Sequence, residues 1–114
     1  MATYLRGIDL RYFLTLHLIN FGPKSIAELI DAVHESGFAV SGRPSKTISD
    51  ALRWERRRGR IVRQDRGNYR AREVPRTTER RIHTRVMELR ATNRESESLD
   101  AFFAAAHGFG TDHL

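Results

Sequence analysis

The sequence predicts a mainly α-helical fold with a small β-hairpin, followed by a C-terminal helical extension. Apolar residues recur at helical spacing in three successive stretches between residues 7 and 58. Two short β-prone runs, residues 60–64 and 69–72, then enclose a turn that contains glycine. A further stretch with helical periodicity follows, and the whole length of 114 residues fits one ordinary domain.

The first helix is expected over residues 7–20. Its apolar side chains recur about one turn apart, at Ile8, Tyr12, Leu16 and Ile19. The segment Asn-Phe-Gly-Pro at residues 20–23 supplies the stop signals. We expect the aromatic side chains of Tyr4, Tyr12 and Phe13 to lie in the core.

The second helix is expected to begin at Ser25. Ser25 and Glu28 have the spacing of a capping box, in which each side chain bonds a backbone N–H near the helix start. An apolar stripe follows at Ile26, Leu29, Ile30 and Val33. Gly37 is placed to end the helix in a left-handed conformation, with Phe38 folding back on it.

The third helix is expected to begin at about Pro44 or Ser45, because the residue before a proline avoids helical angles. It runs to Arg58 and stops at Gly59. Its inward face is formed by Ile48, Ala51, Leu52 and the aliphatic stem of Glu55. Its outward face carries Lys46, Thr47, Ser49, Asp50, Arg53, Arg56 and Arg57. Trp54 is expected in the core or in an interface.

The hairpin unit closes at Pro75, and another helix is expected from Thr77 or Thr78 to about Arg94. The acidic, serine-bearing segment at residues 95–98 is expected to break this helix. A short helix over residues 99–107 and a frayed end at residues 108–114 follow.

The chain thus divides into a domain of residues 1–75 and a C-terminal helix and tail of residues 76–114. Ile82, Val86 and Leu89 lie one turn apart on one side of the C-terminal helix, where the short tail cannot bury them completely. They either pack on the first helix or pair with a second copy of the chain. We expect a homodimer, whose interface Phe102 and Phe103 would complete.

The positive charge is concentrated in the middle of the chain. Residues 43–94 carry seventeen basic and six acidic residues, a net +11, whereas residues 1–42 carry −1 and residues 95–114 carry −4. Eighteen of the twenty basic residues are arginine, which suits bidentate contacts to phosphate and guanine. An arginine-rich composition alone would not explain this clustering, so the middle of the chain is the candidate anion-binding region.

Two consecutive segments carry a resemblance to a known family. The helix RPSKTISDALRWERRRG at residues 43–59 leads into the hairpin RIVRQDRGNYR at residues 60–70. Over about residues 7–72, three helices followed by this hairpin resemble the bacterial winged helix-turn-helix DNA-binding proteins, without indicating one subfamily. The connector at residues 37–43 is longer than the ~3–4-residue turn of the simple motif.

The resemblance implies that the third helix enters a major groove and that the hairpin, the wing, lies over the adjacent backbone or minor groove. Arg66, beside Gly67 at the tip of the wing, is the strongest single candidate for a phosphate or minor-groove contact. The residues expected to contact double-stranded DNA are Ser45, Lys46, Thr47, Ser49, Arg53, Arg56, Arg57, Arg63, Arg66 and Arg70.

The expected function is sequence-preferring binding of double-stranded DNA, as in a transcriptional regulator. One alternative is an architectural, nucleoid-type protein with little sequence preference, and another is a winged helix that docks an acidic protein. The ratio of specific to non-specific affinity at fixed salt separates the first two, because regulators typically reach ~10³ or more.

An enzyme is not expected. The five histidines are far apart in sequence, there is no cysteine, and neither a Gly-rich phosphate loop nor a nucleophile elbow is found. We therefore expect no catalytic residue, metal, cofactor or small-molecule ligand. No apolar run approaches the ~20 residues needed to span a bilayer. Without a secretory signal at the N-terminus, the expected location is the cytoplasm, in association with the nucleoid.

Overall fold

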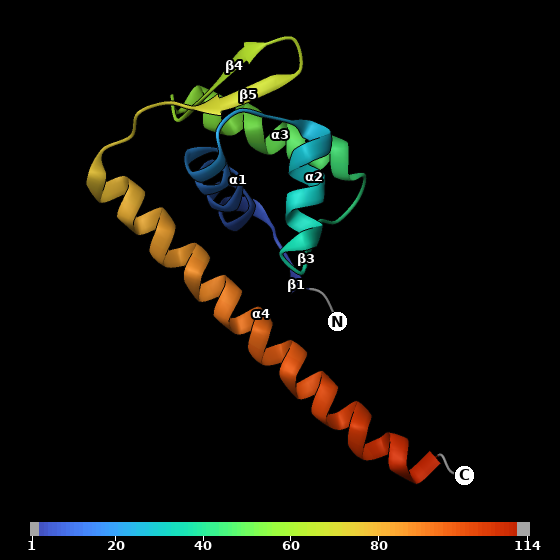
Figure 1. The fold of residues 1–114 in the computed structure, drawn as a ribbon. Helices are drawn as coiled ribbons and strands as arrows, with labels where there is room; N and C mark the ends of the chain where they lie inside the picture. Colours follow the sequence, from blue (N-terminus) through green and yellow to red (C-terminus); the bar gives the residue numbers. More distant parts are fainter. Residues whose placement is uncertain (1–2, 112–114) are drawn as a thin grey trace.

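The computed structural model describes the backbone of residues 3–111 and the side chains of residues 3–94. In this part of the chain there are four helices and five short strands (Figure 1). The helices are α1 (Gly7–Phe21), α2 (Ile26–Glu35), α3 (Pro44–Arg57) and α4 (Arg76–Thr111). The strands are β1 (Thr3–Tyr4), β2 (Lys24–Ser25), β3 (Phe38–Ala39), β4 (Ile61–Asp65) and β5 (Asn68–Ala71). The predicted mainly helical fold with a small sheet is confirmed.

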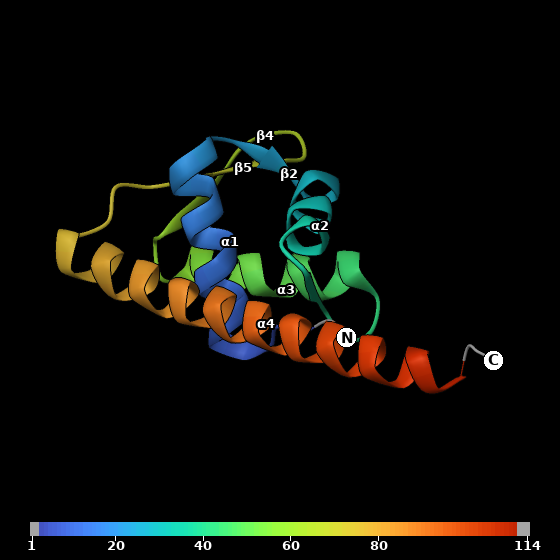
Figure 2. The same ribbon diagram turned by 60° about the horizontal axis from the view of Figure 1, so that its bottom comes forward.

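Helix α1 is the centre of the fold. It contacts α3, α4 and β5, and in Figure 2 it lies between α4 in front and α3 behind. Consequently α1 is buried almost all the way round, with Phe13, Leu14 and Leu18 at most 2% exposed. A helix that is apolar on every side is stable only inside a protein, so its neighbours form around it.

The predicted ends of α2 are confirmed in their physical details. Ser25 caps α2 with a complete capping box: Glu28 N donates to Ser25 Oγ at 3.2 Å, and Ser25 N donates to Glu28 Oε1 at 2.8 Å. Gly37 has a φ of +84°, the left-handed conformation that favours glycine after a helix. Phe38 folds back into the core and is 2% exposed.

The hairpin of β4 and β5 is also confirmed, and β2 joins it as a third antiparallel strand. Lys24 pairs with Tyr69 and Ser25 with Asn68, so the segment before α2 is tied to the turn end of the hairpin. The sequence did not predict β2, because two residues are too few to show strand periodicity. Tyr69 packs on the core, as expected, and is 8% exposed.

The long connector between α2 and α3 is held by a second, two-stranded sheet. β1 and β3 pair in parallel, and Leu5 N donates to Ala39 O at 2.8 Å. At the other end of the connector, Thr47 Oγ1 donates to Ser41 O at 2.8 Å. These bonds fix the approach to α3 although the connector is longer than a simple turn.

Glu55 differs from its prediction, because its carboxylate as well as its stem is buried (0% exposed). The carboxylate accepts hydrogen bonds from Thr15 Oγ1 at 2.8 Å, Arg60 Nε at 2.7 Å and Arg60 Nη2 at 2.9 Å. Arg11 Nε lies 3.8 Å from Glu55 Oε2, an electrostatic contact beyond hydrogen-bond length. The hydrogen bond with Glu55 raises the pKa of Arg60, so this partly buried group remains charged.

The predicted break at residues 95–98 is wrong, since α4 continues through it to Thr111. Glutamate is a good helix former, and the first glycine after Arg76 is Gly108. The segment at residues 99–107 is therefore part of α4 rather than a separate helix. The frayed end was expected from residue 108; residues 108–111 are helical, and residues 112–114 lie outside the described residues.

The first half of α4 belongs to the core. Ile82 and Val86 are fully buried (0% exposed), and Leu89 packs against the same cluster, so these side chains are not available as a surface for a second copy. Asn93 Nδ2 donates to Gly37 O at 3.1 Å. Arg85 Nε donates to Asp9 Oδ1 of α1 at 3.0 Å. Among the described residues, no helix has both the length and the apolarity needed to cross a bilayer.

Tyr4 is 52% exposed, so its predicted place in the core is wrong. Side chains alternate along an extended segment, and the neighbouring Leu5, 1% exposed, takes the inward position. The guanidinium of Arg6 lies over the ring of Tyr4, 5.8 Å from its centroid.

Replacing Glu55 with alanine is expected to lower the free energy of unfolding by about 3–5 kcal/mol, because it leaves the largely buried Arg60 guanidinium without its counter-charge. Urea denaturation followed by circular dichroism measures this loss. The matched control is Glu88→Ala, which removes an exposed carboxylate bonded to Arg85 and should leave the unfolding midpoint unchanged. Equal midpoints for the two variants would contradict the role of Glu55.

Candidate nucleic-acid interface

The outward face of α3 carries a row of charged side chains. Lys46, Asp50, Arg53 and Arg57 follow one another at spacings of four, three and four residues, which places them along one side of the helix. Lys46 Nζ donates to Asp50 Oδ2 at 2.9 Å, and this hydrogen bond lowers the pKa of Asp50. The N-terminal half of the row is therefore internally paired, whereas its C-terminal half is purely basic.

The basic half of α3 faces the first strand of the hairpin across a groove. The groove has a volume of about 510 Å³ and is lined by Arg53, Arg56, Arg57, Ile61, Val62 and Arg63. Its four arginines are exposed, and within residues 3–94 none of them forms an ion pair with an acidic side chain. We call Arg53, Arg56, Arg57 and Arg63 the arginine groove.

Arg60 shows why the groove remains basic. It belongs to the same run of arginines in the sequence, yet its guanidinium turns inward to Glu55. The bond from Arg60 N to Glu55 O, 3.0 Å long, fixes the turn between α3 and β4 at Gly59. Gly59 has a φ of +76°, which a side chain would disfavour. One arginine thus orders the turn, and its neighbours are left on the surface.

The residues expected at the start of α3 lie in different environments. Ser45 and Lys46 are exposed in the first turn, and Ser49 is half-buried. Thr47 is half-buried, and its hydroxyl proton is used in the bond to Ser41 O. Arg43 occupies the N-cap position without a side-chain hydrogen bond. The first turn therefore keeps backbone N–H groups that attract an anion.

The hairpin carries the other expected arginines outside the groove. Arg66 lies in the tight turn beside Gly67, whose φ is +80°, and it is exposed. Arg70 pairs with Val62 and is exposed, while Arg63 pairs with Tyr69. Opposite residues of an antiparallel pair share a face, so Arg63 and Arg70 lie on different faces of the hairpin. Of the hairpin arginines, Arg63 lines the groove with α3.

Trp54 was expected in the core or in an interface; it is 50% exposed, so of these two alternatives the core is excluded. It lies on the α1 side of α3, in a groove of about 190 Å³. The guanidinium groups of Arg11 and Arg57 lie 5.3 Å and 5.8 Å from its ring centroid, both within cation–π distance. Trp54 thus links Arg57 of the arginine groove to α1.

Sequence reasoning did not include Arg11 in the site. It is one of three basic residues in an N-terminal segment of net negative charge, so charge clustering gave no signal for it. Only the packing of α1 against α3 brings Arg11 to Trp54 and Glu55.

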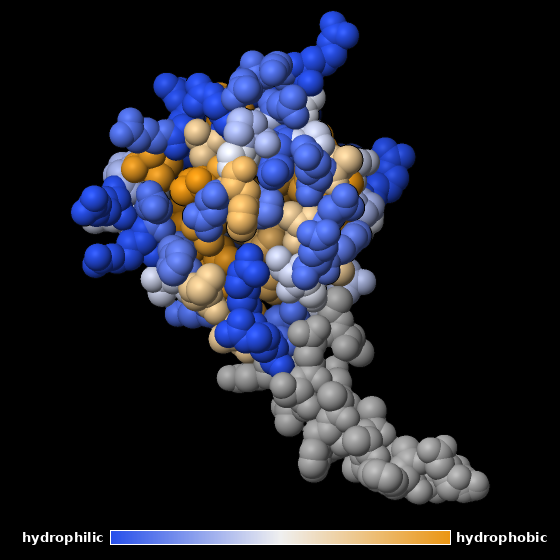
Figure 3. Space-filling view, in the orientation of Figure 1, coloured by the Kyte–Doolittle hydropathy of each residue, from blue (hydrophilic) through white to orange (hydrophobic). Residues whose placement is uncertain are grey.

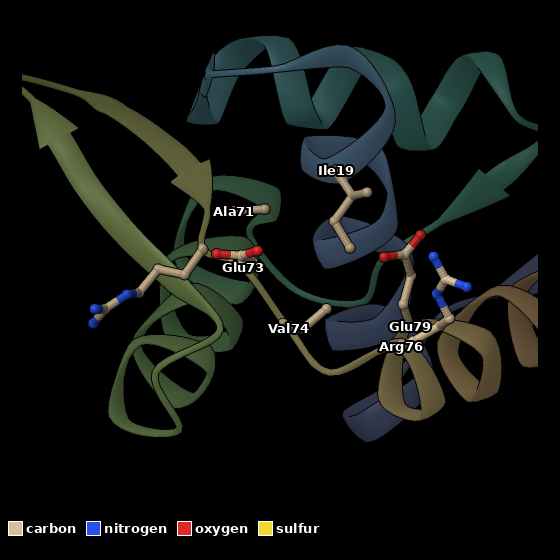
Figure 4. A pocket seen from close by; sticks show the side chains of 7 residues that line it. Ile19, Ala71, Glu73, Val74, Arg76 and Glu79 are labelled. Carbon is tan, nitrogen blue, oxygen red and sulfur yellow. The ribbon is translucent and has the colours of Figure 1, made fainter.

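Another cavity, of about 570 Å³, lies between α1, the end of β5 and the start of α4. Figure 4 shows the carboxylates of Glu73 and Glu79 on either side of it, with the apolar side chains of Ile19 and Val74 between them. Within the residues that the structure describes, no group of three or more His, Asp or Glu side chains is placed to hold a metal ion.

Comparison with protein-family models, with characterised proteins and with solved structures finds no match to this chain. The physical properties of the arginine groove and of α3 therefore carry the functional argument.

Replacing Trp54 with alanine is expected to lower the free energy of unfolding by only ~1 kcal/mol, since half of the side chain is already in water. Phe13→Ala is the comparison, because loss of a fully buried aromatic ring costs ~3–5 kcal/mol. Thermal and urea denaturation followed by circular dichroism measures both. A cost for Trp54→Ala as large as that for Phe13→Ala would contradict the exposed position of Trp54.

Proposed function

We propose that this chain is a winged-helix protein that binds double-stranded DNA, with α3 in the major groove and the hairpin of β4 and β5 as the wing. The observation that carries the proposal is the arginine groove, in which four arginines from α3 and β4 surround one open groove. Guanidinium groups bind phosphate bidentately, and a groove between a helix and a hairpin fits one backbone of the duplex.

The charge distribution supports phosphate as the main ligand. The net +11 of residues 43–94 includes α3, the wing and the first part of α4, whereas residues 1–42 have a slight negative charge. Such an asymmetric field attracts a polyanion at long range. Arg43 and Lys46 add positive charge near the N-terminus of α3, where the first backbone N–H groups also favour an anion.

In this arrangement each set of residues has a distinct role. Ser45, Lys46 and Ser49 belong to the end of α3 that would reach base edges, because the first turns of a recognition helix enter the groove. The arginine groove anchors one phosphate strand. Arg66, at the tip of the wing, reaches the neighbouring backbone or minor groove. The preferred function is regulation of transcription at a defined site.

The pairing of Lys46 with Asp50 favours a second candidate function, an architectural DNA-binding protein with little sequence preference. Two of the polar groups best placed to read bases bond to each other, whereas the arginines suited to phosphate have no acidic partner within residues 3–94. Phosphate contacts carry affinity without sequence information. The ratio of specific to non-specific affinity at fixed salt decides between the two, at about 10³ or more for a regulator.

Fluorescence-anisotropy titration of a random-sequence duplex over a salt series tests DNA binding itself. Arg53→Ala and Arg63→Ala are each expected to weaken binding and to reduce the slope of log K against log salt by about 1, as expected for loss of one phosphate contact. Arg80→Ala, an exposed arginine of α4, is the charge-matched control and should have a smaller effect on both quantities.

Wild-type affinity that does not fall with salt would contradict phosphate anchoring. Equal losses of DNA affinity for Arg53→Ala, Arg63→Ala and Arg80→Ala would show that binding depends on the overall charge and not on the arginine groove.

A further inference from the structure

The face of the molecule opposite α3 has an aromatic centre. α1, α2 and α4 lie in front of α3 (Figures 1 and 2), and hydrophobic residues gather in the middle of this face with charged residues around them (Figure 3). Phe21, at the end of α1, is 63% exposed, and its ring centroid lies 4.7 Å from that of His17. A contiguous apolar patch rimmed by polar residues, unlike a single exposed apolar side chain, is typical of an interaction surface.

One flank of this centre is acidic. A groove of about 410 Å³ between α1 and α2 contains both His17 and Phe21. Its acidic lining comes from Glu28, Asp31 and Glu35, which are exposed on one side of α2. Glu28 is engaged by the capping box, but Asp31 and Glu35 form no ion pair within residues 3–94. These two carboxylates form the acidic strip.

The other flank, on α4, is basic. The guanidinium of Arg90 lies 5.5 Å from the ring centroid of Phe13, and Arg90 Nε has no hydrogen-bond partner among the described side chains. Helical spacing places His83, Met87 and Arg94 on the same side of α4 as Arg90. His83 and Arg94 are exposed, and Met87 is 42% exposed. These four residues form the basic strip.

His17 joins the two flanks. Burial, and then the positive charges of Lys24 and Arg90, lower its pKa, while Glu35 acts in the opposite direction. The ring is therefore neutral at neutral pH and belongs to the apolar centre of the face. Arg90 of α4 and Glu35 of α2 therefore both influence the pKa of His17.

We propose that this face binds a second copy of the chain about a two-fold axis, with the acidic strip of each copy against the basic strip of the other. The two strips lie on opposite flanks of one aromatic centre, so a two-fold rotation brings each strip onto its opposite charge and the two Phe21 rings together. This is the self-complementarity that an isologous interface requires. A purely acidic or purely basic partner would match only one flank.

The interface leaves the arginine groove uncovered. Because α3 lies on the far side of α1, the two grooves of such a pair face outward in different directions. The inference concerns self-association and does not depend on whether the groove binds DNA.

Sedimentation velocity of the full chain over a wide range of concentration tests the inference, with two double variants that change the charge at exposed positions. One variant, Asp31→Arg with Glu35→Arg, carries basic residues on both flanks. The other, Met87→Glu with Arg94→Glu, carries acidic residues on the α4 flank. Wild type is expected to dimerise and each variant alone to be monomeric through like-charge repulsion, whereas an equimolar mixture of the two restores the dimer.

Asp65→Arg, a reversal on the wing, is the control and should dimerise like wild type. Circular dichroism checks that every variant is folded. A wild type that stays monomeric throughout overturns the inference, as does a dimer that persists in both variants. Failure of the mixture to associate also overturns it, because complementary flanks are the basis of the proposed contact.

Discussion

The buried carboxylate of Glu55 is the constraint on which the rest of the structure depends. It accepts hydrogen bonds from Thr15 of α1 and from Arg60, the residue before β4, and therefore joins the central helix, α3 and the hairpin at one point. An uncompensated charge in the interior is so costly that Glu55 and Arg60 must come together. Their pairing sets the direction in which β4 leaves α3. The arginine groove exists because β4 leaves in that direction.

Local signals predicted the helix ends and the hairpin. The capping box at Ser25 and the glycine at residue 37 act within a few residues, and such effects can be read from a short stretch of sequence. Contacts between distant residues could not be predicted in this way. The pairing of β2 with β5 and of β1 with β3 involves two-residue strands without periodicity. The acidic, serine-bearing segment at residues 95–98 predicted a break in α4, but neither serine nor glutamate interrupts a helix by itself.

The sequence predicted that arginines form the candidate site, but not which arginines lie together. The excess of arginine between residues 43 and 94 indicated an anion-binding surface, but charge counting cannot tell which arginine turns inward. Arg60 bonds Glu55, whereas Arg56, Arg57 and Arg63 line the groove. Trp54 was expected in the core or in an interface; its ring is 50% exposed and lies close to two guanidinium groups. Ile82 and Val86 are buried, so they are not part of the surface that we propose for self-association.

The fold divides its arginines between those bonded to carboxylates, such as Arg60, and the exposed arginine groove that we propose binds DNA. The most direct measurement is an NMR titration of the ¹⁵N-labelled chain with duplex DNA, observing the arginine Nε–H signals individually. The signals of Arg53, Arg56, Arg57 and Arg63 are predicted to shift on binding, while those of Arg60 and Arg85, already bonded to Glu55 and Asp9, remain in place. Shifts confined to arginines of α4, or a change at Arg60 equal to that at Arg53, would contradict the account.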